Sequence, residues 1–191
     1  MPYYGVGKLA IGGTVRTLLQ QIRAGLDANL YYLSLYVALT IPDICGALDS
    51  DNGYATAEKY KDWYRRNVAP KYELDPAWRR MLGRDYYLSP EDCYIFRNSL
   101  LHQGTTLHPG AGWERIFFVE PSVLTITSHL NVVDNALNID LRTFCDDVIT
   151  GAEQWLDEVE STERYLRNYD GFLRRHADGL APFIVGVPII G

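Results

Sequence analysis

The chain has 191 residues, of which 47% are apolar and 22% charged, and its formal net charge is −6. This composition is typical of one soluble globular domain, and the acidic balance excludes a broad basic surface for nucleic acid. Its three cysteines stand far apart without a CxxC pair, which favours reduced, buried thiols in a cytoplasmic protein over disulfides. We find no leader pattern and no apolar run of membrane-spanning length, and therefore expect no membrane partner.

One long helix is expected near the start of the chain, after a glycine-rich and flexible N-terminus over residues 1–13. From Thr14 to Ile41 apolar residues recur at spacings of three and four, which is the pattern of a buried helical stripe. Pro42 is expected to end this helix. The helix also carries Tyr31, Tyr32 and Tyr36. Such a cluster favours a core or dimer contact over stacking on bases.

Two helices with clear boundaries are expected in the middle of the chain, one of them over residues 55–68. A short helix around Trp78 is possible between them. The other clear helix begins at Ser89 and Pro90, because serine caps a helix and proline suits its first turn. Gly104 is a natural end for that helix.

The C-terminal half is expected to combine a small β element with one last helix. Residues 115–119 and 122–126 have strand composition and are joined around Glu120 and Pro121, which suggests a hairpin. The last helix begins near Asp140. The pattern as a whole predicts a mainly α fold, a single helical domain over residues 14–179 with a small β-hairpin insertion. An apolar tail, 180–191, is expected to dock on the core or on another chain.

The helix that ends at Gly104 carries three functional polar groups in six positions, namely Arg97, Asn98 and His102. Arginine is permanently charged, and histidine titrates near neutral pH. On an ideal helix, residues five apart are rotated by roughly 140°, whereas residues four apart share a face. We therefore expect Arg97 and His102 to meet only if the last helical turn loosens or if two copies of the helix form a dimer.

The segment from Arg97 to His102 resembles the signature of the HEPN superfamily (higher eukaryotes and prokaryotes nucleotide-binding domains). That signature is an arginine followed after four to six residues by a histidine, often with a polar residue directly after the arginine, as Asn98 is here. The long first helix and the position of the motif near the end of a later helix are also similar. The resemblance implies a HEPN-like helical bundle that acts as a homodimer.

The resemblance further implies a metal-independent endoribonuclease with a composite site at the dimer interface. His102 would exchange a proton with the ribose 2′-hydroxyl or the leaving oxygen, Arg97 would hold the phosphate, and Asn98 would orient either group. His108 and Gln103 follow directly and are candidate substrate-binding residues. No metal or cofactor is expected, because the histidines and cysteines lack ligand spacing.

The alternative is a non-catalytic HEPN-like interaction or nucleotide-binding domain, for example a defence or toxin–antitoxin component. Arg97 would then pair with a carboxylate such as Asp92 or one on another helix, and His102 would cap the helix end. A carboxylate of the same chain that satisfies Arg97 would favour this alternative.

Overall fold

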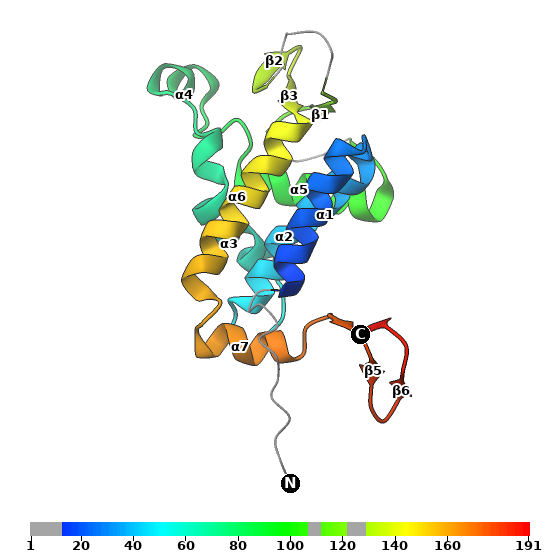
Figure 1. Cartoon of the computed structure of the whole chain (residues 1–191). Coiled ribbons are helices and arrows are strands. Elements are labelled where there is room, and N and C mark those ends of the chain that lie inside the picture. The colour runs from blue at the N-terminus through cyan, green and yellow to red at the C-terminus, as the bar shows by residue number, and fades with distance from the viewer. Residues whose placement is uncertain (1–12, 107–111, 122–128) are drawn as a thin grey trace.

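The computed structural model describes residues 13–106, 112–121 and 129–191 (Figure 1). These residues form seven α-helices and three small sheets, so the chain is mainly α as predicted. The helices and the one 3₁₀ turn are α1 (Gly13–Asp27), α2 (Tyr31–Leu48), α3 (Ala57–Asn67), η1 (Ala69–Tyr72), α4 (Pro76–Leu82), α5 (Pro90–Gln103), α6 (Leu141–Val159) and α7 (Glu163–Asp170). The strands are β1 (Arg115–Val119), β2 (Asn131–Val133), β3 (Ala136–Asp140), β4 (Arg175–His176), β5 (Gly179–Leu180), β6 (Ile184–Val185) and β7 (Ile189–Ile190).

The predicted first helix is two helices, and the expectation of one continuous helix ending at Pro42 was wrong. The break lies at residues 28–30, where Asn29 adopts a positive φ of 59° and the Leu30 amide donates to the Gly25 carbonyl at 2.7 Å. Asparagine tolerates this left-handed conformation better than most residues. Pro42 lies inside α2 and is buried. Packing on both sides of α2 therefore outweighs the backbone hydrogen bond that proline removes.

Helix α2 is the centre of the bundle and contacts α1, α3, α5, α6 and α7. It is apolar along its whole length, and Asp43 is its only charged residue. The core around it is rich in aromatic side chains that meet edge to face, such as Trp63 and Trp155 with ring centroids 6.2 Å apart. Such pairs add a favourable quadrupole interaction to the burial of large apolar surface. Gly151 lets α6 approach α3 closely, because a Cβ there would overlap the Asn67 carbonyl oxygen.

Helix α5 has the boundaries that its sequence predicts. The Ser89 hydroxyl accepts from the Asp92 amide at 3.0 Å, and Pro90 occupies the first turn. Gly104 ends the helix with a φ of 64°, and its amide donates to the Leu100 carbonyl at 3.0 Å. A left-handed residue at this position is most easily a glycine.

The three-stranded sheet differs from the predicted hairpin. β1 pairs in parallel with β3, with Ile116 opposite Leu137, and the antiparallel hairpin is β2–β3 instead. The hairpin turn consists of Asp134 and Asn135, both with positive φ, as a type I′ turn requires. The predicted second strand, 122–126, lies outside the described residues. The predicted joint at Glu120 and Pro121 therefore stays a prediction, and β1 gains a parallel partner, β3, that strand composition did not indicate.

Helix α6 begins where expected, with the Asp140 side chain accepting from the Thr143 amide at 2.7 Å. It is not the last helix, because α7 follows and lies across the end of the bundle formed by the start of α1 and the end of α2 (Figure 1). After α7, residues 174–191 form a two-stranded ribbon in which β4 pairs with β7 and β5 with β6. The apolar tail is one strand of this ribbon, and it is exposed instead of docked on the helices.

Candidate functional site

The structure places all three motif residues on α5, on the side that faces α2. The guanidinium of Arg97 donates through Nη1 to the Asn98 side-chain oxygen at 2.8 Å. The side chain of Arg97 is only 19% exposed, whereas His102 lies at the surface in the last helical turn. Asn98 thus holds the guanidinium through a contact from the same helix.

Arg97 and His102 meet within one chain, at 3.4 Å between Nη1 and Nε2. The expectation that a regular α5 would keep them apart was wrong. The 140° rotation describes Cα positions, but the long arginine side chain bends along the helix surface and covers that angle. Because a guanidinium only donates, a hydrogen bond in this contact requires Nε2 of His102 to be the acceptor.

Asp43 of α2 completes the group, and nothing in the motif pointed to it. Its Oδ2 lies 2.6 Å from Nη2 of Arg97. Burial raises the pKa of this carboxyl, and the opposing influences of Arg97 and His102 are smaller. Asp43 is the only charged residue of an otherwise apolar helix. A charge in such a setting needs a partner, and that signal would have identified Asp43 as part of a site.

The ion pair leaves hydrogen-bonding capacity unused. Among the described residues, Nε of Arg97 and Oδ2 of Asp43 are buried without a well-directed hydrogen bond, although the pair is in close contact. Unsatisfied buried groups are rare in proteins and call for an explanation. Arg97 therefore retains an unpaired Nε donor that is buried in this structure.

The two candidate substrate-binding residues are not brought into this group. Gln103 is exposed at the end of α5, and His108 lies outside the described residues. The alternative partner of Arg97, Asp92, is instead buried and pairs with Arg84. It also accepts from the Gly112 amide at 2.7 Å, so it closes the loop that precedes β1. The group on α5 and α2 therefore consists of Arg97, Asn98, His102 and Asp43.

A second polar group lies between η1 and the start of α6. Asp147 accepts from the Tyr72 hydroxyl at 3.0 Å and from Lys71 Nζ at 2.8 Å. The side chain of Asp147 is only 16% exposed. His129 stacks edge-on against Tyr72 at 5.9 Å. These contacts are mutually satisfied and anchor the sheet to the bundle.

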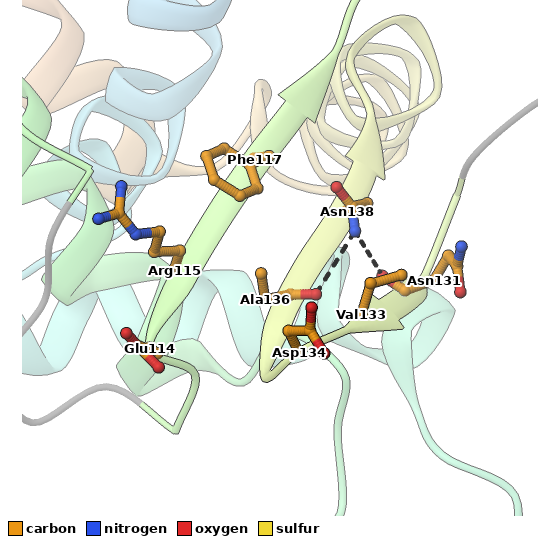
Figure 2. A pocket seen from close by; sticks show the side chains of 8 residues that line it. All are labelled: Glu114, Arg115, Phe117, Asn131, Val133, Asp134, Ala136 and Asn138. Carbon is orange, nitrogen blue, oxygen red and sulfur yellow. Dashed lines mark hydrogen bonds between the residues drawn. The ribbon is translucent and has the colours of Figure 1, made fainter.

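An open hollow of about 580 Å³ lies on the solvent face of the sheet. Figure 2 shows side chains of all three strands around it, including Phe117, Val133 and Asn138. The lining residues are Glu114, Arg115, Phe117, Asn131, Val133, Asp134, Ala136 and Asn138. It offers no histidine, cysteine or hydroxyl for acid–base or nucleophilic chemistry. We therefore place the candidate site at Arg97 and His102, away from this hollow.

Two further properties concern metals and membranes. The described segments contain no group of three or more His, Cys, Asp or Glu side chains arranged to hold a metal ion. By length and hydropathy α2 qualifies as a membrane-spanning helix, with half of the segment buried inside the structure. The central helix of a bundle has the same properties.

We compared the chain with protein-family models, with curated proteins and with solved structures, and none of the three comparisons found a match.

Proposed function

We propose that this chain is a HEPN-like RNA-processing protein, a metal-independent endoribonuclease in which Arg97 and His102 act together. The observation that carries the proposal is the 3.4 Å contact between the Arg97 guanidinium and the imidazole of an exposed histidine. A fixed cation beside a basic nitrogen suits the transfer of a proton near a phosphate. The mainly helical fold is compatible with a HEPN-like bundle.

The reaction that these groups support is transesterification of RNA. Neutral His102 takes the proton of a ribose 2′-hydroxyl, and the 2′-oxygen attacks the adjacent phosphorus. The bond from phosphorus to the 5′-oxygen breaks, and that oxygen receives a proton from an imidazolium or from water. The products are a 2′,3′-cyclic phosphate and a 5′-hydroxyl. Arg97 stabilises the negative charge that develops on the phosphoryl oxygens.

Asp43 is a positioning residue in this proposal. Its contact with Nη2 holds the arginine side chain in place, while Nη1 faces His102 and Nε keeps a free donor among the described groups. A phosphate oxygen would take the place of the imidazole at Nη1 and so release Nε2 of His102 as a base. Asn98 keeps the guanidinium plane oriented through its own contact at 2.8 Å.

Partners follow from the same proposal. The substrate is single-stranded RNA or a nucleotide, and the active form is a homodimer in the cytoplasm. Because Arg97 and His102 meet within one chain, a second copy is not needed to bring them together. Its contribution would be to enclose the substrate or to supply the acid for the leaving oxygen.

The experiment compares cleavage of a fluorescent single-stranded RNA by the wild type, Arg97→Ala and His102→Ala in the presence of EDTA. Loss of one acid–base group is expected to lower the rate by about 100-fold or more. Arg80→Ala is the matched control, because Arg80 is an exposed arginine on α4, away from α5. Circular dichroism confirms that each variant is folded. No cleavage by the wild type, or a rate unchanged from the wild type in both folded variants, would refute the nuclease.

One observation favours the alternative, a non-catalytic interaction or nucleotide-binding domain. Arg97 forms an ion pair with Asp43 inside its own chain, as a structural arginine would. In that case Arg97→Ala lowers the free energy of unfolding and no RNA is cleaved by any form of the protein. Equilibrium dialysis with labelled mononucleotides then separates a nucleotide-binding domain, whose binding His102→Ala weakens, from a pure interaction domain.

A further inference from the structure

The ribbon over residues 174–191, which we name the C-terminal arm, is a built structure that stands apart from the helices (Figure 1). Gly179 adopts a φ of 84°, and a Cβ there would collide with the Ile184 carbonyl, so glycine is needed for the two strands to approach. The Gly186 amide closes the ribbon by donating to the Asp178 carbonyl at 2.9 Å. The arm therefore has a defined shape although the bundle does not cover it.

The arm exposes far more apolar surface than a free ribbon tolerates. Phe183 at its tip is 80% exposed, and the consecutive Ile184 and Val185 are 49% and 69% exposed. Consecutive residues of a strand point to opposite faces, so both faces of the tip are apolar. Taking roughly 200 Å² for a large side chain, the exposed apolar residues of the arm present on the order of 700 Å². This total over both faces is close to the share of one partner in a stable interface, about 800 Å².

The charges near the tip favour a protein surface over a lipid surface. Residues 177–191 contain no lysine or arginine, and their one charged side chain is the exposed Asp178. Apolar segments that insert into anionic membranes carry basic residues beside the apolar ones. The arginines of the arm lie at its base, where Arg174 is near Asp170 at 3.5 Å and Arg175 is exposed in β4. An uncharged, apolar partner surface fits this tip better.

This chain itself presents such a surface at the opposite end of the bundle. At the start of α2, Leu30, Tyr32 and Leu33 are 50%, 77% and 63% exposed, and no charged residue lies between positions 28 and 42. We name these three residues the α2 patch. The arm leaves beside α7, where α1 begins and α2 ends. The α2 patch lies where α1 ends, near the start of α6, as the Arg142–Asp27 pair shows.

We propose that the C-terminal arm clasps the α2 patch of a second copy of this chain. An arm at one end and a receiving patch at the other allow two antiparallel copies to exchange arms about a two-fold axis, which closes the assembly at a dimer. The arm is long enough for this exchange. An extended strand from Arg174 to Phe183 spans about 30 Å. The distance along the bundle from the base of the arm to the α2 patch is set by α1, and a helix of that length spans about 20 Å. The proposal does not depend on RNA cleavage.

The first test is the mass of the full-length chain by sedimentation equilibrium. The wild type is expected to be a dimer, and Phe183→Ser or Leu33→Ser should raise the dimer dissociation constant by about 30-fold or more, as loss of a central anchor does. Met81→Ser is the matched control, because Met81 is 64% exposed on α4 and belongs to neither surface. A monomeric wild type, or a dimer unaffected by both variants, would overturn the proposal.

The second test locates the contact. A tagged Phe183→Cys chain is mixed with an untagged Leu33→Cys chain and treated with a short bis-maleimide; the native cysteines are buried and give little background. The mixed species should form, and should not form when Met81→Cys replaces Leu33→Cys. Equal cross-linking with Met81→Cys contradicts the arrangement, as does a monomer that binds phosphatidylserine vesicles through Phe183. His102→Ala should leave the dimer intact, so failure of the nuclease and failure of the arm exchange are distinguishable.

Discussion

The contact between Arg97 and Asp43 predicts a strong energetic coupling between α5 and α2. In Asp43→Leu the guanidinium of Arg97 keeps its charge but loses its carboxylate, while its side chain is only 19% exposed. Breaking a fully buried pair in this way costs about 3–5 kcal/mol, and residual contact with water should reduce the cost to about 2–3 kcal/mol. In Asp43→Leu/Arg97→Met both charges are absent, and the double variant should lie within about 1 kcal/mol of the wild type.

The other single variant of this double-mutant cycle, Arg97→Met, should have a free energy of unfolding that depends on pH. In Arg97→Met the Asp43 carboxyl loses the cation that opposes the effect of burial, and burial already raises its pKa. A carboxyl with a raised pKa binds its proton more tightly in the folded state, so stability falls as pH rises from the unfolded pKa through the folded one. Arg97→Met should therefore be relatively more stable at pH 5 than at pH 7.

Urea unfolding followed by tryptophan fluorescence measures the free energy of unfolding of the wild type and the three variants. Trp63 and Trp155 are buried and therefore report on the core. The expected coupling free energy is about 2 kcal/mol or more. If the double variant instead loses the sum of both single losses, the two side chains do not act as a pair, and the account of Arg97 as a held cation fails.

Three further predictions concern the rest of the fold. Burial raises the pKa of Cys93 and Cys145 to about 12, so Ellman's reagent at pH 8 should react with them at least ~1000-fold more slowly than with the urea-unfolded chain; rapid native labelling would contradict this burial. Burial lowers the pKa of His129, so the folded state favours its neutral form. Wild-type stability should therefore fall more than that of His129→Gln between pH 7 and pH 5, and parallel pH profiles would show that His129 titrates alike in both states. Gly151→Ala should lower the free energy of unfolding by about 1–3 kcal/mol, because its Cβ would overlap the Asn67 carbonyl. Gly171→Ala is the control, with open space at its Cβ, and should change the free energy little. Equal effects of the two variants in urea unfolding would refute the close approach of α6 to α3.

The helix ends that are fixed by local contacts could be predicted from the sequence. Ser89 and Asp140 cap the helices that follow them, and Gly104 ends α5, because each acts within four residues. The break at Asn29 was missed because the apolar spacing continues from α1 into α2 without interruption. The prediction that Pro42 ends the helix was wrong for the opposite reason. Proline removes a backbone hydrogen bond and locally favours a helix end, but the burial of α2 maintains the helix through it.

The candidate site shows the same division between local and distant information. The three motif residues are neighbours in sequence: Arg97, Asn98 and His102. Arg97 reaches His102 because the arginine side chain is long, and the expectation based on a rotation of roughly 140° between their Cα positions did not consider that length. Asp43 lies 54 positions before Arg97, and only the packing of α2 against α5 brings it there. The pairing of β1 with β3 likewise depends on contacts between distant segments, which strand composition does not specify.

The central claim is that His102, held beside Arg97, cleaves RNA through the ribose 2′-hydroxyl. The most direct test is a DNA oligonucleotide that contains one ribonucleotide, incubated with the wild type in EDTA and analysed by mass spectrometry. The account predicts a single cut after the ribonucleotide, a 2′,3′-cyclic phosphate on one product and a 5′-hydroxyl on the other, with none of these in His102→Ala. Cleavage at deoxyribose positions, a 5′-phosphate product, or an uncut oligonucleotide would contradict it.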